Sequence, residues 1–481
     1  MPYSETRSAA LCVDLDGTLI KSDLLFESLA RLFKKKPWLV LLVPFWCLRG
    51  RAALKQELAR RVPIEVASLP YNWQLVEWLK KQKATNRELL LVTAADASLA
   101  NQVADHLGLF DRVIASDGRQ NLKGRRKLES LRTQVAGEFD YVGNSWSDLD
   151  IWQHSANAIT VGASPSLVKR VKKFAPEAIN FDGRAGRWRS WLAALRVHQW
   201  AKNVLIFVPL ITSHQFMHLR LVLECSVGFL LFSLCSSAQY ILNDLADLEA
   251  DRHHATKRRR PFASGDLPIV AGFVVAPALL AASLVITAVL LSKLAAAALA
   301  TYFVLSFSYS LYFKRFILLD AFILSGLYTF RIVVGHLVTG VAFSSWLLSF
   351  AFFLFLSLAF SKRWSELHNV QRHNTRIVGR GYRVDDLAQV NLFGVCSAFL
   401  SAVVFMLYLQ SDKVRELYRQ PQPLWLLSPV YLYWVSRLWI RSSRGEIGED
   451  PIIFVLKDPV TYLVVAAAGA IMLVAAAGWL H

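Results

Sequence analysis

The sequence predicts two parts: an α/β domain with a parallel sheet in residues 1–190, and an all-α membrane domain of about nine transmembrane helices in residues 191–481. Composition and its distribution along the chain indicate this division. Of the 481 residues, 54% are hydrophobic and 19% are charged, which is too apolar for an ordinary soluble enzyme. The apolarity is uneven, because charged residues occur throughout the first part, whereas long apolar runs fill the chain after Asn203.

The second part consists of apolar runs that follow one another closely. Each run approaches the roughly 20 residues that a helix needs to cross a bilayer. The count of about nine includes a short or partly re-entrant first helix at 204–213. The longer runs include residues 221–242, 269–291, 294–313, 344–360 and 460–480.

Arginine and lysine concentrate in alternate loops, at 252–260, 314–315, 362–383 and 437–444. The positive-inside rule therefore places these loops and the amino-terminal domain in the cytoplasm, and the carboxyl terminus outside. We expect a multi-pass protein of the cytoplasmic membrane whose net charge of +18 serves topology and contact with anionic lipids. Nucleic acid is not an expected partner, because the amino-terminal domain lacks a basic patch with base-stacking aromatic residues. No signal in the sequence indicates an oligomeric state.

Polar residues follow three apolar strands of the first part. Residues 10–13 lead into Asp14-Leu15-Asp16-Gly17-Thr18, residues 89–92 lead into Thr93, and residues 141–143 lead into a polar tip that ends at Asp148. Lys123 stands at the start of a helical stretch between the last two strands. Because ligands of open α/β sheets bind beyond the carboxyl ends of strands, we expect these four stations to converge.

In their order along the chain, the four stations resemble the motifs of the haloacid-dehalogenase (HAD) phosphatase superfamily. The resemblance implies a Rossmann-like α/β domain with a helical cap at about residues 24–85. It also implies that Asp14 is the nucleophile that forms an aspartyl-phosphate and that Asp16 is the general acid and base. The implied phosphoryl-binding residues are Thr93 and Lys123, with Lys127 as the substitute lysine, and the implied Mg²⁺ ligands are Asp14, Asp16 and Asp148.

Two features of this domain depart from a plain HAD pattern. The fourth motif commonly begins Gly-Asp, whereas this chain has Gly143-Asn144, so one carboxylate of the metal site is missing. Within the expected cap, the apolar run 38–48 is too short to span a bilayer, and we expect it to dip into the lipid surface.

An acidic segment closes the apolar run 221–242. As a helix, it would place Asp244, Asp247 and Asp251 on one face, with Asn243 beside them. Carboxylates at the end of a membrane helix are costly unless they are neutralised. Oxygen ligands at this spacing suit Mg²⁺, which usually joins one or two carboxylates to substrate phosphates. The basic run 257–260 follows directly, so the segment predicts a metal–diphosphate site at a bilayer surface.

The acidic segment resembles the first aspartate-rich motif of the UbiA superfamily of intramembrane prenyltransferases, and the resemblance covers about residues 190–480. Supporting features are Arg196 and Lys202-Asn203 before the first helix. The resemblance implies that Asn243, Asp244, Asp247 and Asp251 bind Mg²⁺ and the donor diphosphate, that Lys257 and Arg258 neutralise the leaving group, and that Lys202 also binds phosphate.

The second station of that superfamily is different in this chain. Prenyl-transferring members carry another aspartate-rich motif after the sixth helix, whereas residues 361–367 here read Ser-Lys-Arg-Trp-Ser-Glu-Leu. One acid with two cations suits a phosphate monoester better than a second Mg²⁺. The pattern resembles the branch that joins polyprenyl phosphate to 5-phosphoribosyl diphosphate. Lys362 and Arg363 would then hold the polyprenyl phosphate, Glu366 would orient one of them, and Tyr309, Lys314 and Arg331 would be additional candidates.

The predicted function is a Mg²⁺-dependent membrane transferase that makes polyprenyl-phospho-phosphoribose, which the HAD domain then dephosphorylates to polyprenyl-phosphoribose. One alternative is an aromatic or quinone-pathway prenyltransferase that uses an isoprenyl diphosphate, with Asp385-Asp386 as the replacement acidic motif. The other alternative is a non-catalytic scaffold that binds lipid phosphates.

Overall fold

The computed structural model describes residues 9–117, 122–181, 187–373, 381–447 and 451–477. The chain forms two compact units. The first unit contains residues up to 197 together with 240–278, and the membrane unit contains 198–239 and the residues from 279 onwards. The acidic segment therefore belongs to the same compact unit as the amino-terminal α/β domain.

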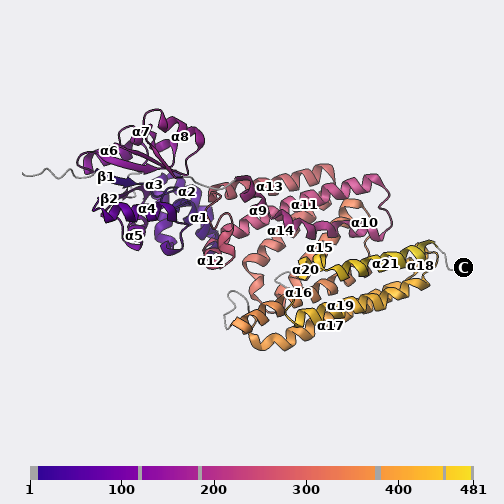
Figure 1. The fold of residues 1–481 in the computed structure, drawn as a ribbon. Coiled ribbons are helices and arrows are strands. Elements are labelled where there is room, and N and C mark those ends of the chain that lie inside the picture. The colour runs from indigo at the N-terminus through magenta and orange to yellow at the C-terminus, as the bar shows by residue number, and fades with distance from the viewer. Residues whose placement is uncertain (1–8, 118–121, 182–186, 374–380, 448–450, 478–481) are drawn as a thin grey trace, which may run out of the picture. The chain divides into compact units, whose positions relative to one another are not determined.

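The α/β domain contains six parallel strands in the order β3-β2-β1-β4-β5-β6 (Figure 1). The strands are β1 Ala10–Val13, β2 Leu89–Asp96, β3 Arg112–Ser116, β4 Phe139–Gly143, β5 Ala158–Val161 and β6 Ile179–Phe181. All residues of β1 and β4 are buried, as expected for central strands of a sheet covered on both faces. The strand order reverses between β1 and β4, so the sheet has its topological switch point, where ligands bind in such folds, beside Asp14.

Helices cover both faces of this sheet. Side chains of α4 (Trp73–Ala84) and α5 (Ala97–Leu107) fill the core on one face. The core of the other face receives side chains from α6 (Arg125–Gln134), α7 (Leu149–Trp152) and α8 (Pro165–Lys172). The predicted α/β class with a parallel sheet is confirmed.

The cap consists of α1 (Leu24–Lys35), η1 (Pro37–Leu42), α2 (Val43–Leu48) and α3 (Arg51–Arg61). These helices share a small core of their own around Leu32, Trp46 and Leu58. The expected cap extended to about residue 85, but Leu75, Val76 and Leu79 of α4 pack into the main sheet core. The part with a separate core therefore ends near Val62.

Seven of the described helices are long and apolar enough to cross a membrane. The expected count of about nine included residues 204–213, which form parts of the short helices η4 (Val197–Phe207) and α10 (Val208–Thr212). Helix α19 (Leu427–Ser443) has 17 residues and is also not one of the seven. The seven helices are α11 Leu219–Ala246, α13 Ile269–Leu290, α14 Lys293–Leu311, α15 Leu319–Thr339, α16 Ser345–His373, α17 Leu387–Leu409 and α21 Pro459–Ala477.

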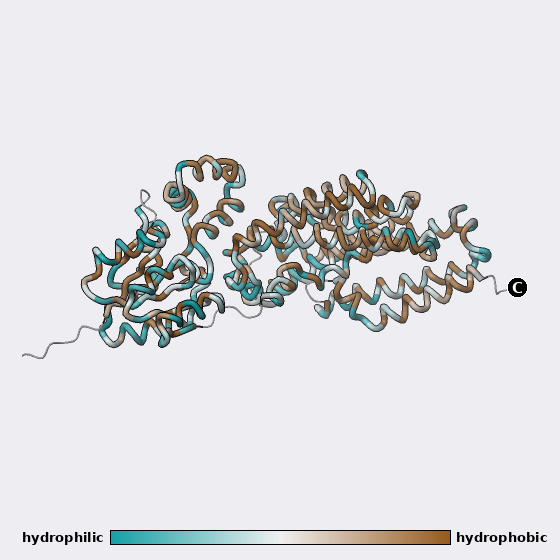
Figure 2. Tube along the Cα trace, turned by 90° about the horizontal axis from the view of Figure 1, so that it is seen from above, coloured by the Kyte–Doolittle hydropathy of each residue, from teal (hydrophilic) through white to brown (hydrophobic). Residues whose placement is uncertain are grey.

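These helices carry apolar side chains around most of their circumference, and their tubes are largely brown in Figure 2. Only 22% of the most apolar window of α13 and 6% of that of α21 is buried within the protein. Apolar helices with so little protein contact require lipid as their surroundings. The protein is therefore an integral membrane protein.

The shorter helices connect these elements. They are η2 Val66–Ser68, η3 Trp146–Asp148, α9 Arg187–Leu195, α12 Leu248–His253, η5 Lys257–Arg259, η6 Phe313–Arg315, η7 Val384–Asp386, α18 Asp412–Leu417, η8 Gln422–Leu426 and α20 Pro451–Lys457.

Candidate functional site

The acidic segment is a helix with an interruption at Asp247. Helix α11 ends at Ala246, and Asp247 is the N-cap residue of α12. The backbone N–H of Asp247 donates to the carbonyl of Asn243 at 2.9 Å, and that of Asp251 donates to the carbonyl of Asp247 at 2.8 Å. The chain therefore keeps its helical direction through the interruption, and the helical spacing of the three aspartates is largely preserved.

Asp244 and Asp251 are buried and joined by one arginine. Their exposed fractions are 2% and 3%. Nη1 of Arg260 lies 3.1 Å from Asp244 Oδ1 and 2.7 Å from Asp251 Oδ2, and Arg196 forms a further ion pair with Asp244. Burial raises the pKa of Asp251, and the charge of Arg260 opposes that rise. Two carboxylates and two guanidinium groups thus form one compact cluster at the end of α11.

The cations that contact the two aspartates are not the ones expected to bind the diphosphate, whose role stays a prediction. Lys257 and Arg258 were expected to neutralise the leaving group, and both lie in the turn η5, where Arg258 is exposed to solvent. Arg260, which follows η5, makes the contacts with Asp244 and Asp251.

Asp247 contacts the cap. Its Oδ1 lies 2.8 Å from Nζ of Lys34, at the end of α1. Two further pairs continue the contact, from Arg31 to Glu249 at 2.9 Å and from Glu27 to Arg252 at 2.6 Å. The positions on α1 increase while those on the acidic segment decrease, so the two helices pair antiparallel. We call these three ion pairs the cap ladder.

The innermost pair of the cap ladder is buried. Glu27 and Arg252 have side chains that are 6% and 8% exposed, and both guanidinium nitrogens of the fork bond to the carboxylate. Nε of Arg252 also donates to the carbonyl of Ala263 at 2.9 Å. This bidentate pair, together with the bond from Nε, fixes the orientation of both helices.

The oxygen atoms of the acidic segment fit Mg²⁺ chemically. Among the described residues, no three carboxylate, imidazole or thiolate side chains converge as a ready-made metal site. Mg²⁺ usually takes only one or two protein carboxylates and completes its octahedron with water and substrate phosphate. Asp244 and Asp251, which already share one cation, would hold the metal, with Asn243 beside them.

The predicted second station forms a separate network in the membrane unit. Arg363 is 1% exposed, and its guanidinium contacts Asp320 at 2.7 Å, Glu366 at 2.6 Å and Tyr309 at 3.2 Å. The hydroxyl of Tyr382 donates to the other oxygen of Asp320 at 2.8 Å. Arg363 is thus buried and paired with two carboxylates, and its expected role as a phosphate-binding cation stays a prediction.

Half-buried lysines accompany this network. Lys362 precedes Arg363 on α16, and Lys314 lies in η6. Both side chains are intermediate in exposure. Lys362 is therefore more accessible to a phosphate than Arg363, which is buried.

A second cationic group lies within the membrane unit around the ring of Tyr328. Lys202 Nζ is 6.0 Å and Arg331 Cζ is 5.0 Å from the ring centroid. Arg331 is 5% exposed, and it donates to Asn203 Oδ1 at 3.0 Å and to the hydroxyl of Tyr302 at 2.9 Å. Cations inside membrane domains are rare and usually serve a substrate or ion pathway, so Lys202 and Arg331 remain phosphate-binding candidates.

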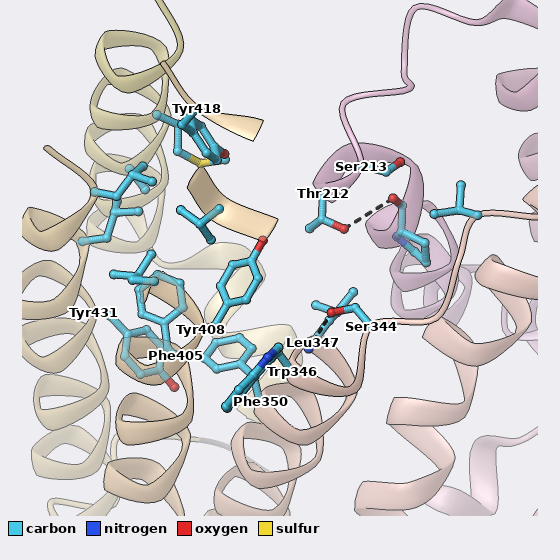
Figure 3. Close-up of a pocket in the computed structure, with 18 of the residues that line it drawn as sticks. Thr212, Ser213, Ser344, Trp346, Leu347, Phe350, Phe405, Tyr408, Tyr418 and Tyr431 are labelled. Atoms are coloured by element: carbon cyan, nitrogen blue, oxygen red, sulfur yellow. Dashed lines mark hydrogen bonds between the residues drawn. The ribbon is translucent and has the colours of Figure 1, made fainter. Parts of the chain in front are cut away.

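The membrane unit also contains an apolar cavity of about 320 Å³, whose lining Figure 3 shows. The rings of Trp346, Phe350 and Phe405 gather on one side of it (Figure 3). The hydroxyl of Thr212 donates to carbonyls of its own helix, so its hydrogen is already used and is not offered to a ligand. Such a lining suits an isoprenoid or acyl chain.

Residues of three of the four stations line one pocket of about 310 Å³, and these are Asp14, Asp16, Lys123 and Asp148. Thr93, of the fourth station, lies within β2 and is not among the residues that line this pocket. It is fully buried, and its hydroxyl accepts from the backbone N–H of Ala95 at 3.0 Å.

Lys127, the substitute lysine, contacts the predicted nucleophile. Its Nζ lies 2.7 Å from Asp14 Oδ1 and 3.0 Å from the hydroxyl of Tyr141, which donates to Asp148 Oδ1 at 3.2 Å. Burial raises the pKa of Asp14, and the charge of Lys127 opposes the rise. Lys123 lines the same pocket but is exposed at its edge.

Asp16 differs from Asp14 in its surroundings. Burial and then the charge of Asp23 raise the pKa of Asp16 to about 8. Its Oδ1 accepts the backbone N–H of Leu24 at 2.9 Å, which holds the carboxyl at the base of the cap. A carboxyl group that keeps its proton at neutral pH can act as a general acid.

Asn144 stands where the HAD pattern has an aspartate, and Gly17 accommodates it. Gly17 has a φ of +74°, and a β-carbon there would meet the Asn144 amide nitrogen at 2.1 Å. Asp148 Oδ2 accepts hydrogen bonds from the backbone N–H groups of Asn144 and Ser145. Asp14 and Asp148 therefore supply the carboxylate oxygens that would hold a metal in this pocket, with Asp16 at its other side.

Several contacts of these sites could not be found from the sequence. Asp320, Tyr382 and the residues of α1 that form the cap ladder gave no motif signal. Arg260 belongs to the basic run that the sequence did identify, and its position nine residues after Asp251 and sixteen after Asp244 is what a hairpin-like return of the chain requires.

The UbiA prenyltransferase family matches residues 204–441. The chain is 40% identical over 462 residues to "Uncharacterized protein y4nM" of Sinorhizobium fredii, covering 95% of this chain and 89% of that protein. It is 33% identical over 189 residues to the decaprenyl-phosphate phosphoribosyltransferase of Corynebacterium glutamicum, covering 39% of this chain and 57% of that enzyme. A solved UbiA homolog from Archaeoglobus fulgidus bound to GPP and Mg²⁺ superposes with a TM-score of 0.43 at 16% identity, covering 60% of this chain and 97% of that one.

Proposed function

We propose, since the chain belongs to the UbiA prenyltransferase family, that its membrane unit and acidic segment transfer a phosphoribosyl group from 5-phosphoribosyl diphosphate to a polyprenyl phosphate. The observation that carries this choice of donor is the second station. Residues 361–367 offer Lys362 beside an arginine that is already neutralised by Asp320 and Glu366, and such a site suits one phosphate monoester. The similarity to a decaprenyl-phosphate phosphoribosyltransferase supports the same choice.

In the proposed transfer, the bond between the anomeric carbon and the diphosphate oxygen breaks, and an oxygen of the polyprenyl phosphate attacks that carbon. Mg²⁺, when bound, would neutralise the diphosphate. Asp244 and Asp251 would hold the metal, and Arg196 and Arg260 would contact the leaving group. The apolar cavity lined by Trp346 and Phe405 would accept part of the isoprenoid chain.

The α/β domain would then hydrolyse the 5-phosphate of the lipid product. Asp14 would attack phosphorus while Asp16 gives its proton to the departing sugar oxygen. Water would next hydrolyse the aspartyl-phosphate, with Asp16 taking the proton, and inorganic phosphate would leave. The pKa of Asp16 near 8 suits the first of these steps.

The rival prenyl transfer lacks support from the proposed replacement motif. Asp386 accepts the backbone N–H of Arg383 at 2.8 Å and belongs to the cap at the start of α17. Its carboxylate therefore already serves the helix, and Asp385 alone offers little for a second metal.

The test uses the purified full chain in detergent with Mg²⁺, polyprenyl phosphate and radiolabelled phosphoribosyl diphosphate. We expect label in the organic phase for the unmodified chain, and a loss of at least about a hundredfold for Asp244→Asn. Asp266→Asn, in the loop before α13, is the matched control and should keep full transfer, because the carboxylate of Asp266 accepts from Ser264 within its own turn. Absence of label, with isoprenyl transfer to 4-hydroxybenzoate instead, would favour the prenyltransferase.

A further inference from the structure

The cap carries a line of large apolar side chains that the rest of the first unit does not cover. Trp38, Leu41, Phe45 and Leu48 are 65%, 77%, 64% and 86% exposed. They recur at intervals of three and four residues through η1 and α2, so they share one helical face. We call this line the cap stripe.

The opposite face of the same segment is also apolar. Leu39, Val40 and Val43 pack against the small cap core, and Trp46 is buried within it. A segment with apolar residues on both faces needs a second apolar environment outside the protein. At 12 residues it extends roughly 18–24 Å, which is less than the roughly 30 Å of a bilayer core, so it would lie along a membrane surface rather than cross it.

Basic residues stand at both ends of the cap stripe. Lys34, Lys35 and Lys36 precede it and are exposed, and Arg49 follows it and is also exposed. Arg60 adds a further exposed cation at the end of α3. Apolar side chains flanked by lysine and arginine match the boundary between acyl chains and acidic headgroups. A protein partner of this stripe would have to be apolar in its centre and acidic at both ends.

Contacts within the first unit place the stripe where a membrane helix begins. The ring of Phe33, at the end of α1, meets the ring of Phe273 edge-on at 6.3 Å between centroids. Phe273 lies in the second turn of α13, which is one of the apolar spans. Trp38 is five residues after Phe33, so at most about 17 Å separates the start of the stripe from this contact.

The cap ladder makes that placement rigid. Glu27, Arg31 and Lys34 hold α1 against α12 at three successive levels, and the innermost pair is buried. The backbone of Gly265 approaches Lys21 so closely that a β-carbon would lie 2.6 Å from its side chain. The loop that leads into α13 is therefore fitted to the base of the cap.

We propose that the cap stripe inserts into the surface of a bilayer that contains acidic lipids, as a monotopic anchor of the α/β domain. The pocket around Asp14 also has Phe26, Pro268, Ile269 and Val270 in its wall, and the last two are the first residues of α13. The anchor thus holds this pocket beside the point where a membrane helix starts, within reach of phosphates carried on lipids.

The test measures the surroundings of a spin label in the full chain, reconstituted in vesicles of phosphatidylcholine and phosphatidylglycerol. Cys47 and Cys396 are replaced by serine, because the other three cysteines are buried. Labels are attached after Leu41→Cys or, as the matched control, Trp73→Cys, whose side chain is 58% exposed on α4. Collisions with oxygen report lipid, and collisions with a water-soluble nickel chelate report water.

We expect the label at position 41 to collide at least several times more often with oxygen than with the nickel chelate, and the label at 73 to show the reverse. Equal access of the chelate to both positions would overturn the proposal. Dipolar broadening between labels on two copies, with position 41 shielded from both reagents, would show a second chain on the stripe and would overturn it too. If Leu41→Cys does not fold, Phe45→Cys provides the same comparison.

A second measurement addresses the substrate and rests on the proposed phosphatase function. Phe45→Glu should lower hydrolysis of a lipid-borne phosphate monoester in the same vesicles at least tenfold, while hydrolysis of soluble p-nitrophenyl phosphate stays unchanged. Equal rates for lipid-borne substrate in the variant and the unmodified chain would count against the anchor. Hydrolysis of neither substrate by the unmodified chain would instead refute the phosphatase function.

Discussion

Asp14 and Asp16 stand two residues apart, yet they have different charged neighbours. Burial raises the pKa of both carboxyl groups. Lys127, 2.7 Å from Asp14, opposes the rise for Asp14, whereas the charge of Asp23 adds to the rise for Asp16, whose pKa reaches about 8. A carboxyl group beside a cation and one beside an anion can serve as nucleophile and acid in one reaction.

The pH dependence of phosphate release should follow from this difference. Asp16 carries its proton below about pH 8, so release should be steady there and fall as the pH rises through about 8. Asp23→Asn removes a charge that raises this pKa and keeps a capping side chain for α1, so the falling limb should move to lower pH. A falling limb that does not move in this variant would contradict the assignment.

Arg363 should be a stabilising residue of the membrane unit. Arg363→Ala would leave Asp320, whose side chain is fully buried, without its cation, at a cost of about 3–5 kcal/mol. Thermal unfolding in detergent measures the change. Arg220→Ala, at an exposed pair with Glu224, is the control and should cost less than about 1 kcal/mol. Equal loss for the two variants would argue against the buried network.

At the residue scale, the sequence predicted where the polar candidate residues lie better than it predicted which residues pair with one another. The strand tips that carry Asp14 and Asp148 could be placed because apolar strands end where polar residues begin. The partner of Arg363 could not be predicted, because Asp320 is 43 residues away in the sequence and the pairing of the two residues depends on how α15 packs against α16. The sequence could not show which of Lys123 and Lys127 is buried, because about one helical turn separates them. In the structure Lys127, on α6, is the buried one.

At the scale of elements, the cap ladder joins α1 to the acidic segment by charge alone. Glu27→Arg should place two guanidinium groups against each other and loosen α1, and so should Arg252→Glu through two opposed carboxylates. The double variant restores opposite charges and should recover part of the loss, with a coupling of about 0.5–3 kcal/mol. Hydrogen exchange of the α1 amides in the full chain measures the loosening.

The matched control for this cycle is the exposed pair of Lys80 and Glu77 on α4, where reversal should leave the exchange of α1 almost unchanged. Unaltered exchange in Glu27→Arg would show that the ladder does not hold the cap.

The boundaries of the elements show what the sequence can and cannot specify. Apolar length predicted the long spans, but two shorter apolar stretches became helices of 5 and 17 residues because local composition does not fix where a helix ends. The interruption at Asp247 was not predictable either. It accompanies a contact with Lys34, which lies 213 residues earlier in the chain.

At the scale of the whole molecule, the two proposed reactions should be separable by single substitutions. Asp14→Asn should leave transfer intact and cause the 5-phosphorylated lipid to accumulate, because the nucleophile is lost while the acidic segment is untouched. Asp244→Asn should abolish transfer and leave hydrolysis of p-nitrophenyl phosphate unchanged. Chromatography of the lipid products and release of nitrophenol provide the two measurements. Identical lipid products from Asp14→Asn and the unmodified chain would refute the phosphatase step.

The division into an α/β domain and a helical membrane domain was predictable because composition changes sharply along the chain. The assignment of residues 240–278 to the same compact unit as the α/β domain was not. Those residues leave one apolar span and enter another, so only their tertiary contacts reveal that they belong with the cap.

The cap ladder has a consequence for the history of the chain. A descendant that lost the α/β domain would leave Arg252, Glu249 and Asp247 facing water or lipid with no counterparts, and Arg252 would lose a buried carboxylate. Such a truncation would be viable only together with changes in the first loop. The α/β domain and the first loop therefore depend on each other, and exchanges of sign at positions 27 and 252 should arise in tandem wherever both are inherited.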